Sequence, residues 1–154
     1  MTRFEIDDMS VVNWSINVST EAELASIPRV ITDLTIEENS LNDPTMTYLA
    51  FTDLNSLRTL TIGSNSLQHL QSLSFSELNS LKTLHIGENA LLMITTMTIS
   101  PNSLNSLPSI DLTPFTNLTR LMINSNSLNG LRNMTIDGID RVVIRERSLM
   151  SIER

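Results

Sequence analysis

The chain has no cysteine, only two histidines and few aromatic side chains, which make up 4% of its 154 residues. Without cysteine, a disulfide framework, a thiolate metal site and a cysteine nucleophile are all excluded. His69 and His85 stand in no HxH, HExxH or histidine–carboxylate spacing, so the common metal and catalytic motifs are missing. We therefore expect no enzyme site, no metal and no cofactor.

Long apolar runs and an excess of basic residues are also missing. No apolar stretch approaches the roughly 20 residues that span a membrane, and the first residues lack the apolar core of a signal peptide. Lysine and arginine number 10 against 17 acidic residues, for a formal net charge of −7. This balance disfavours nucleic acid as a partner, because nonspecific binding depends on neutralising phosphates. We expect a soluble, cytoplasmic chain, or an extracellular or cell-surface one if it belongs to a longer exported protein.

One phrase recurs along the chain. It reads LRTLTIGSNSLQHL from Leu57 and LKTLHIGENALLMI from Leu81. A period in the range of about 20–29 residues, with leucines at fixed offsets and one asparagine, is typical of a leucine-rich solenoid. One coil alone cannot bury enough apolar surface to offset the entropy of ordering its backbone, so coils must stack on one another. The repeat predicts a β-rich solenoid, a right-handed coil with short parallel strands and few or no helices.

Leu60, Thr61 and Ile62 alternate apolar and polar side chains, which is the pattern of a half-buried strand. Similar triplets recur at intervals that indicate two strands in each coil. The expected strand centres are Leu34, Leu49, Leu60, Leu73, Leu84, Met97, Ile110, Leu121, Met134 and Val142.

An asparagine follows five of the ten expected strands and forms a structural column. Its members are Asn39, Asn65, Asn89, Asn102 and Asn126, and Arg147 replaces it in the last copy. We interpret the column as structural, with each amide satisfying backbone groups where the chain turns. The alternative is that these asparagines contact a ligand.

Two asparagine-type segments follow one another at Leu84 and Met97. Either the segments of this type change from one wall of the solenoid to the other at this point, or roughly residues 91–105 loop out of one long coil. We favour the wall exchange, because the segment from Met97 copies the repeat well, although Pro101 weakens a regular strand end.

The expected domain organisation is continuous. Residues 1–30 form an amino-terminal cap or degenerate repeat, residues 31–138 form the repeats, and residues 139–154 form a shortened carboxy-terminal repeat or cap. Within the first part we expect a strand at 14–18 and a helical turn at 21–27, capped by Ser19 or Thr20.

Residues 57–91, LRTLTIGSNSLQHLQSLSFSELNSLKTLHIGENAL, resemble leucine-rich repeat proteins, especially those with BspA-like and IGxNS-type repeats. The resemblance extends over roughly residues 30–152. It implies a scaffold that recognises other molecules through its exposed residues. The chain departs from many extracellular members in lacking cysteine-rich caps.

We therefore expect noncovalent recognition of another protein or peptide, with a glycan as the alternative ligand, by a monomer or a weakly self-associating chain. The candidate residues point outward from the strands of one wall: Asp33, Thr35, Arg58, Thr61, Lys82 and His85. If the later asparagine-type strands share that wall, Arg120, Met122 and Arg141 join them.

Two other functions compete with this one. The first is a structural or adhesive segment of a surface protein. The second is a carbohydrate-active β-helix enzyme, which would need several carboxylates or basic residues in a cleft on one wall, whereas the outward positions are mainly threonines such as Thr35, Thr61 and Thr98.

Overall fold

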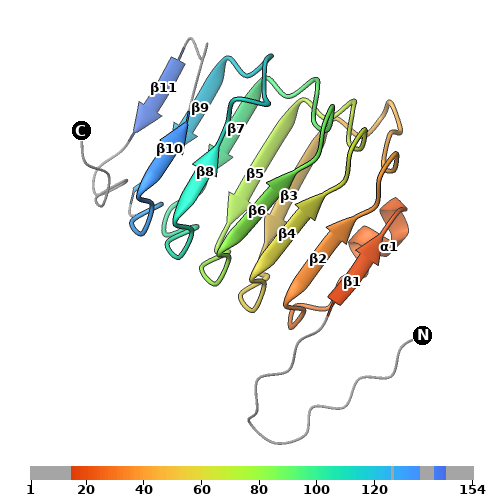
Figure 1. Ribbon diagram of the computed structural model, residues 1–154, viewed down its shortest axis with the longest axis horizontal. Helices are drawn as coiled ribbons and strands as arrows, with labels where there is room; N and C mark the ends of the chain where they lie inside the picture. The colour runs from red at the N-terminus through yellow and green to blue at the C-terminus, as the bar shows by residue number, and fades with distance from the viewer. Residues whose placement is uncertain (1–14, 126, 136–140, 145–154) are drawn as a thin grey trace, which may run out of the picture.

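The computed structural model describes residues 15–125, 127–135 and 141–144. They form a parallel β-solenoid of about four turns, in which each coil contributes one short strand to each of two facing walls (Figure 1). The described residues contain one short helix, α1 (Glu21–Ala25). The predicted fold class, with two strands in each coil and almost no helix, is confirmed.

We call the two walls the front wall and the back wall, as they appear in Figure 1. The front wall begins with a four-stranded sheet of β1 (Ser15–Val18), β2 (Asp33–Ile36), β4 (Thr59–Ile62) and β6 (Thr83–Ile86). It continues with a separate two-stranded sheet of β8 (Ser109–Asp111) and β10 (Asn133–Thr135). The back wall is one sheet of β3 (Tyr48–Thr52), β5 (Ser72–Ser76), β7 (Thr96–Ile99), β9 (Arg120–Ile123) and β11 (Arg141–Ile144).

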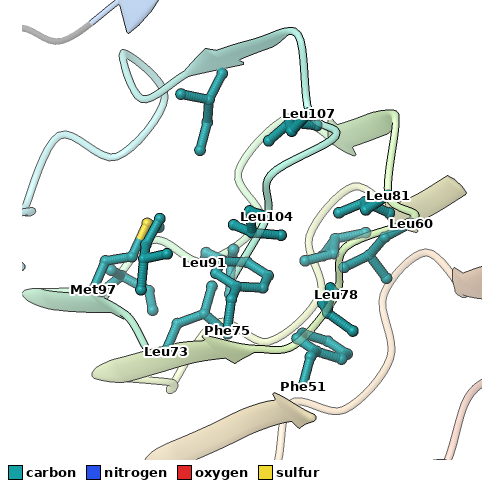
Figure 2. Packing of buried hydrophobic residues seen from close by; sticks show 14 of the residues in the cluster. Phe51, Leu60, Leu73, Phe75, Leu78, Leu81, Leu91, Met97, Leu104 and Leu107 are labelled. Atoms are coloured by element: carbon teal, nitrogen blue, oxygen red, sulfur yellow. The ribbon is translucent and has the colours of Figure 1, made fainter. Parts of the chain in front are cut away.

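Neighbouring coils stack in register, so that identical side chains coincide in the core. Leu60 pairs with Leu34 and Leu84 in parallel strands, and both Leu60 and Ile62 are fully buried. The predicted alternation of inward and outward side chains is confirmed at β4. Between the walls, Phe51 and Phe75 stack with ring centroids 5.9 Å apart (Figure 2).

The wall exchange is confirmed. The strand β7 pairs in parallel with β5, with Met97 beside Leu73, so the segment around Met97 belongs to the back wall. The alternative of a loop at residues 91–105 is therefore wrong. Pro101 lies in the turn after β7, outside the strand, so its missing N–H removes nothing from the ladder.

The long turn of each coil lies at one edge of the solenoid before the wall exchange and at the other edge after it. Before the exchange it leads from the front wall to the back wall, from Gly63 after β4 and from Gly87 after β6. After the exchange the long turn begins at Ser100 and leads from the back wall to the front wall. The front wall is interrupted where this change occurs, between β6 and β8.

The asparagine column is explained by the backbone. Asn39, Asn65, Asn89 and Asn102 all have φ between 58° and 60°, the left-handed region that asparagine tolerates better than most residues. Cross-coil amide hydrogen bonds of these turns come instead from other asparagines, among them Asn42, Asn79, Asn105 and Asn117, as when Asn42 Nδ2 donates to Asn65 O at 2.8 Å. Our expectation that the column amides make such bonds is therefore replaced by a conformational role. Asn126 and Arg147 lie outside the described residues.

Serine, which follows the asparagine in the IGxNS-type repeat, is the second polar column of these turns, and we assigned it no role from the sequence. Ser40, Ser66, Ser103 and Ser127 are buried. Ser127 Oγ donates to Ser100 O at 2.6 Å and lies 3.4 Å from the backbone nitrogen of Ser103, which donates to it. These hydroxyls satisfy backbone groups that would otherwise be buried without partners.

The amino-terminal expectations are met where the structure describes them. The strand β1 pairs with β2 in parallel, and α1 has Thr20 as its N-cap, whose hydroxyl accepts from Glu23 N at 3.2 Å. Trp14, which we expected at the start of this strand, lies outside the described residues. The front wall thus begins with β1 rather than with the first clear repeat.

Candidate functional site

Six of the nine candidate residues gather on the outer side of the front wall. In successive strands Thr35 pairs with Thr61 and Thr61 pairs with His85, so these three form one outward row. Asp33 lies in the next row, beside Thr59.

Arg58 and Lys82 precede β4 and β6 by one residue, and Lys82 N donates to Arg58 O at 2.9 Å. Both side chains are exposed. The front wall therefore carries two neighbouring cations beside a row of hydroxyls that ends at His85.

The other three candidates lie on the opposite side of the molecule. Arg120 pairs with Thr96 and with Arg141 on the back wall, and Met122 pairs with Thr98. The core separates the two walls, so these side chains cannot join the front-wall group in one contact surface. The condition under which we expected them to share a wall is therefore not met.

The back wall has an exposed row of its own. Tyr48, the side chain of which is 60% exposed, pairs with Ser72 at the edge strand β3. The row continues through Thr96 and Arg120 to Arg141. This face mixes one aromatic ring, small hydroxyls and two arginines.

The most distinctive feature of the front wall is the interruption between β6 and β8, which we call the front seam. No backbone hydrogen bond joins these two strands, and nearly all Cα pairs between them are more than 8 Å apart. A cavity of about 230 Å³ opens there, lined by Leu84, His85, Ile86, Asp111 and Pro114. His85 thus lies at the end of the outward row and at the margin of a cavity.

Asp111 is the acidic group of the seam. Its carboxylate accepts from Thr113 Oγ1 at 2.7 Å and from Thr113 N at 3.0 Å. These two hydrogen bonds lower the pKa of Asp111 below its usual value, the side-chain bond contributing most. The seam therefore presents a carboxylate that is ionised at neutral pH.

We did not single out Asp111 from the sequence. A signal was present, because aligning the repeats at Leu57, Leu81 and Leu107 puts Asp111 at the outward position of Thr61 and His85.

A second cavity, of about 490 Å³, lies between α1 and the edge strand β3. Its lining is mainly apolar, with Leu24, Ile27, Met46 and Leu49 among the residues that form it. This cavity lies at the amino-terminal end of the back wall, where α1 rather than a further strand lies beside β3.

Asp53 and Glu77 form an acidic pair at the surface of the back wall. Asp53 and Glu77 occupy equivalent turn positions with φ of 61° and 62°. A hydrogen bond that the protonated Glu77 carboxyl donates to Asp53, together with the repulsion of the Asp53 charge, raises the pKa of Glu77. Arg29 lies 3.8 Å from Asp53, and all three side chains are at the surface, where such pairs contribute little to stability.

Histidine and carboxylate side chains are the groups of the described residues that could bind a metal ion. Within residues 15–125, 127–135 and 141–144, no cluster of three or more histidines, cysteines and carboxylates is close enough to hold a metal ion. No helix of the described part is long and apolar enough to cross a membrane. The exposed groups of the two walls can pair charges and exchange hydrogen bonds with a bound partner.

No protein-family model matches this chain, and neither do the curated proteins or the solved structures with which it was compared. The class that the fold defines is therefore the parallel β-solenoid. The kinship with leucine-rich repeat proteins stays a prediction.

Proposed function

We propose that this chain is a noncovalent recognition scaffold that binds another protein through the outer side of its front wall. The observation that carries the proposal is the convergence of Arg58, Lys82 and His85 on one rigid, in-register face. A preformed sheet loses little conformational freedom on binding, so a few outward side chains can set specificity without rearranging the backbone.

The size and charge of this face indicate which kind of partner it would bind. Four hydrogen-bonded strands about 4.8 Å apart make a face only about 15–20 Å wide, which fits one extended segment or loop better than a large domain surface. The two cations at the amino ends of β4 and β6 favour an acidic group on the partner at that side. The resemblance to leucine-rich repeats supports the same class of function.

A capture experiment with two matched variants tests this proposal. The front-wall variant carries Arg58→Glu, Lys82→Glu and His85→Ala, and the back-wall variant carries Arg120→Glu, Met122→Ala and Arg141→Glu. Far-UV circular dichroism first checks that both fold. A protein captured by the unaltered chain is then purified, and its affinity for all three is measured.

We expect the front-wall variant to lose at least about tenfold in affinity, equivalent to about 1.4 kcal/mol, and the back-wall variant to bind like the unaltered chain. Equal binding by the front-wall variant, or a loss confined to the back-wall variant, would refute the proposal. Association of the chain only with copies of itself in light scattering would favour the structural, adhesive role instead.

A further inference from the structure

We infer that the front seam is a binding site for an extended polypeptide segment, which enters between β6 and β8 as a strand and pairs with both. The inference rests on the proposed function, since it names the kind of segment that the scaffold recognises and the place where it binds. The inference is based on four features of the seam. Two are the interrupted backbone hydrogen bonds at the amino ends and at the carboxyl ends of its strands. The others are its width and the side chains around it.

At the amino ends of the strands, each coil of the front wall is normally tied to the one before it. The backbone nitrogens of Arg58 and Lys82 donate to Thr32 O at 2.7 Å and to Arg58 O at 2.9 Å, and Arg132 N donates to Pro108 O at 2.8 Å. Pro108 occupies this position in the coil of β8. Proline has no N–H, so it cannot donate to Lys82 O across the seam.

At the carboxyl ends, the corresponding bonds are also interrupted. Gly63 N donates to Ile36 O at 2.8 Å, and Gly87 N donates to Ile62 O at 2.7 Å. The equivalent donor in the coil of β8 is Thr113 N, which donates instead to Asp111 Oδ1 at 3.0 Å. Both ends of β8 are thus built so that they do not pair with β6.

The seam is wider than the gap between two paired strands. Paired strands lie about 4.8 Å apart, so two strands that flank a third lie about 9.6 Å apart. The separation of more than 8 Å for nearly all Cα pairs of β6 and β8 excludes direct pairing of these two strands.

The backbone of β6 defines the chemistry of the occupant. The nitrogens of Thr83 and Gly87 donate to the preceding coil. In a parallel strand alternate residues direct their backbone groups to opposite sides, so those of Leu84 and Ile86 face the seam. A row of alternating donors and acceptors is satisfied by another extended backbone, which is the mode of strand addition.

The side chains specify the segment further. Leu84 and Ile86 are only half-buried, whereas their counterparts Leu60 and Ile62 in the preceding coil are fully buried. An incoming strand with apolar side chains at alternate positions would cover them and complete the core.

Charge gives the segment its direction. The exposed cation Lys82 lies at the amino end of β6 beside the seam, and His85 and the ionised Asp111 line its outer side. A parallel segment would therefore carry an acidic residue at its amino end and hydroxyl or basic side chains facing outward.

Amide hydrogen exchange on the whole ¹⁵N-labelled chain tests this inference. The probe is the synthetic peptide Ac-ETLTIG-NH2, and its control is the same peptide N-methylated at alternate amides, which cannot complete the ladder. We expect exchange at Leu84 and Ile86 to slow by at least about tenfold with the probe. Leu60 and Ile62, which are already paired, should not change. The N-methylated control should have no effect.

Charge reversal on the chain supplies matched variants. Lys82→Glu should weaken binding of the peptide at least about tenfold, whereas Arg120→Glu, on the opposite wall, should leave it unchanged within about twofold. Unchanged exchange at Leu84 and Ile86 with the probe at millimolar concentration, or equal protection by the N-methylated peptide, would overturn the inference. Failure of the proposed function is a separate result, since it appears as partner binding that the front-wall variant retains.

Discussion

Substitution of Gly63 by alanine probes the close stacking of the coils. A Cβ atom on Gly63 would lie 2.6 Å from both Ile36 O and Glu38 N, and 2.8 Å from the carbonyl carbon of Glu37. All three atoms belong to the backbone of the preceding coil and cannot rotate away. The added methyl group must therefore push two coils apart.

The sign of the effect is as informative as its size. The φ of Gly63 lies outside the left-handed region, so alanine suits its backbone, and in open space the change would stabilise the chain by about 0.4–1 kcal/mol through the unfolded state. Overpacking in a close-packed interior costs about 1–3 kcal/mol. We therefore expect Gly63→Ala to lower the free energy of unfolding by roughly 1–2 kcal/mol.

Urea denaturation followed by far-UV circular dichroism measures this difference. Ser100→Ala is the matched control, because Ser100 holds the same turn position after β7 and already carries a Cβ atom. Its unfolding free energy should stay within about 0.5 kcal/mol of that of the unaltered chain. A Gly63→Ala chain that is as stable as the unaltered one, or more stable, would refute the stacking that the structure describes.

The remaining predictions concern the core, the turns and one carboxyl pair. Leu60→Ala should cost about 2–5 kcal/mol in urea denaturation, because Leu60 is fully buried, and Leu84→Ala should cost clearly less, because Leu84 is half-buried at the seam. Asn65 has a φ of 59°, so Asn65→Ala should be less stable than Asn65→Gly by about 1 kcal/mol in the same assay. The raised pKa of Glu77 means that its contribution is present below its unfolded pKa and is lost as the pH rises through its folded pKa. Asp53→Asn should lower the pKa of Glu77 in an NMR titration and remove this loss of stability, and an unchanged pKa would show that Asp53 is not its cause.

The sequence alone was enough to predict the strands and their arrangement in two walls. The triplets such as Leu60-Thr61-Ile62 fix which side chains face inward, and in-register stacking follows from the equal spacing of successive copies. Because the same leucine positions recur, the core could be derived from one pattern. The double copy at Leu84 and Met97 also signalled the wall exchange, although the repeat alone left two arrangements open.

The repeat pattern could not predict the seam. Pro108 fits a turn before a strand, and its missing N–H matters only once Lys82 O is known to be its neighbour in the preceding coil. Asp111 and Thr113 likewise resemble any outward position and turn of the repeat. Their hydrogen bond removes a ladder donor, which depends on the conformation of the turn rather than on residue type.

The sequence could not place all nine candidate residues on the correct wall, because it does not give the path of the turns. Arg58, Lys82 and His85 could be assigned to one wall from their spacing, whereas Arg120, Met122 and Arg141 depended on where the exchange occurs. Spacing along the chain gives the face of a strand, and only the path of the turns gives the wall.

Pairs of introduced cysteines test the wall exchange most directly, since the natural chain has no cysteine that would interfere. Ser74 and Thr98 are partners on β5 and β7, at a spacing of about 4.8 Å that a disulfide can span. The account predicts that Ser74→Cys with Thr98→Cys forms a disulfide in the folded chain, and that His85→Cys with Met122→Cys, on opposite walls, does not. A disulfide in the second pair and none in the first would contradict it.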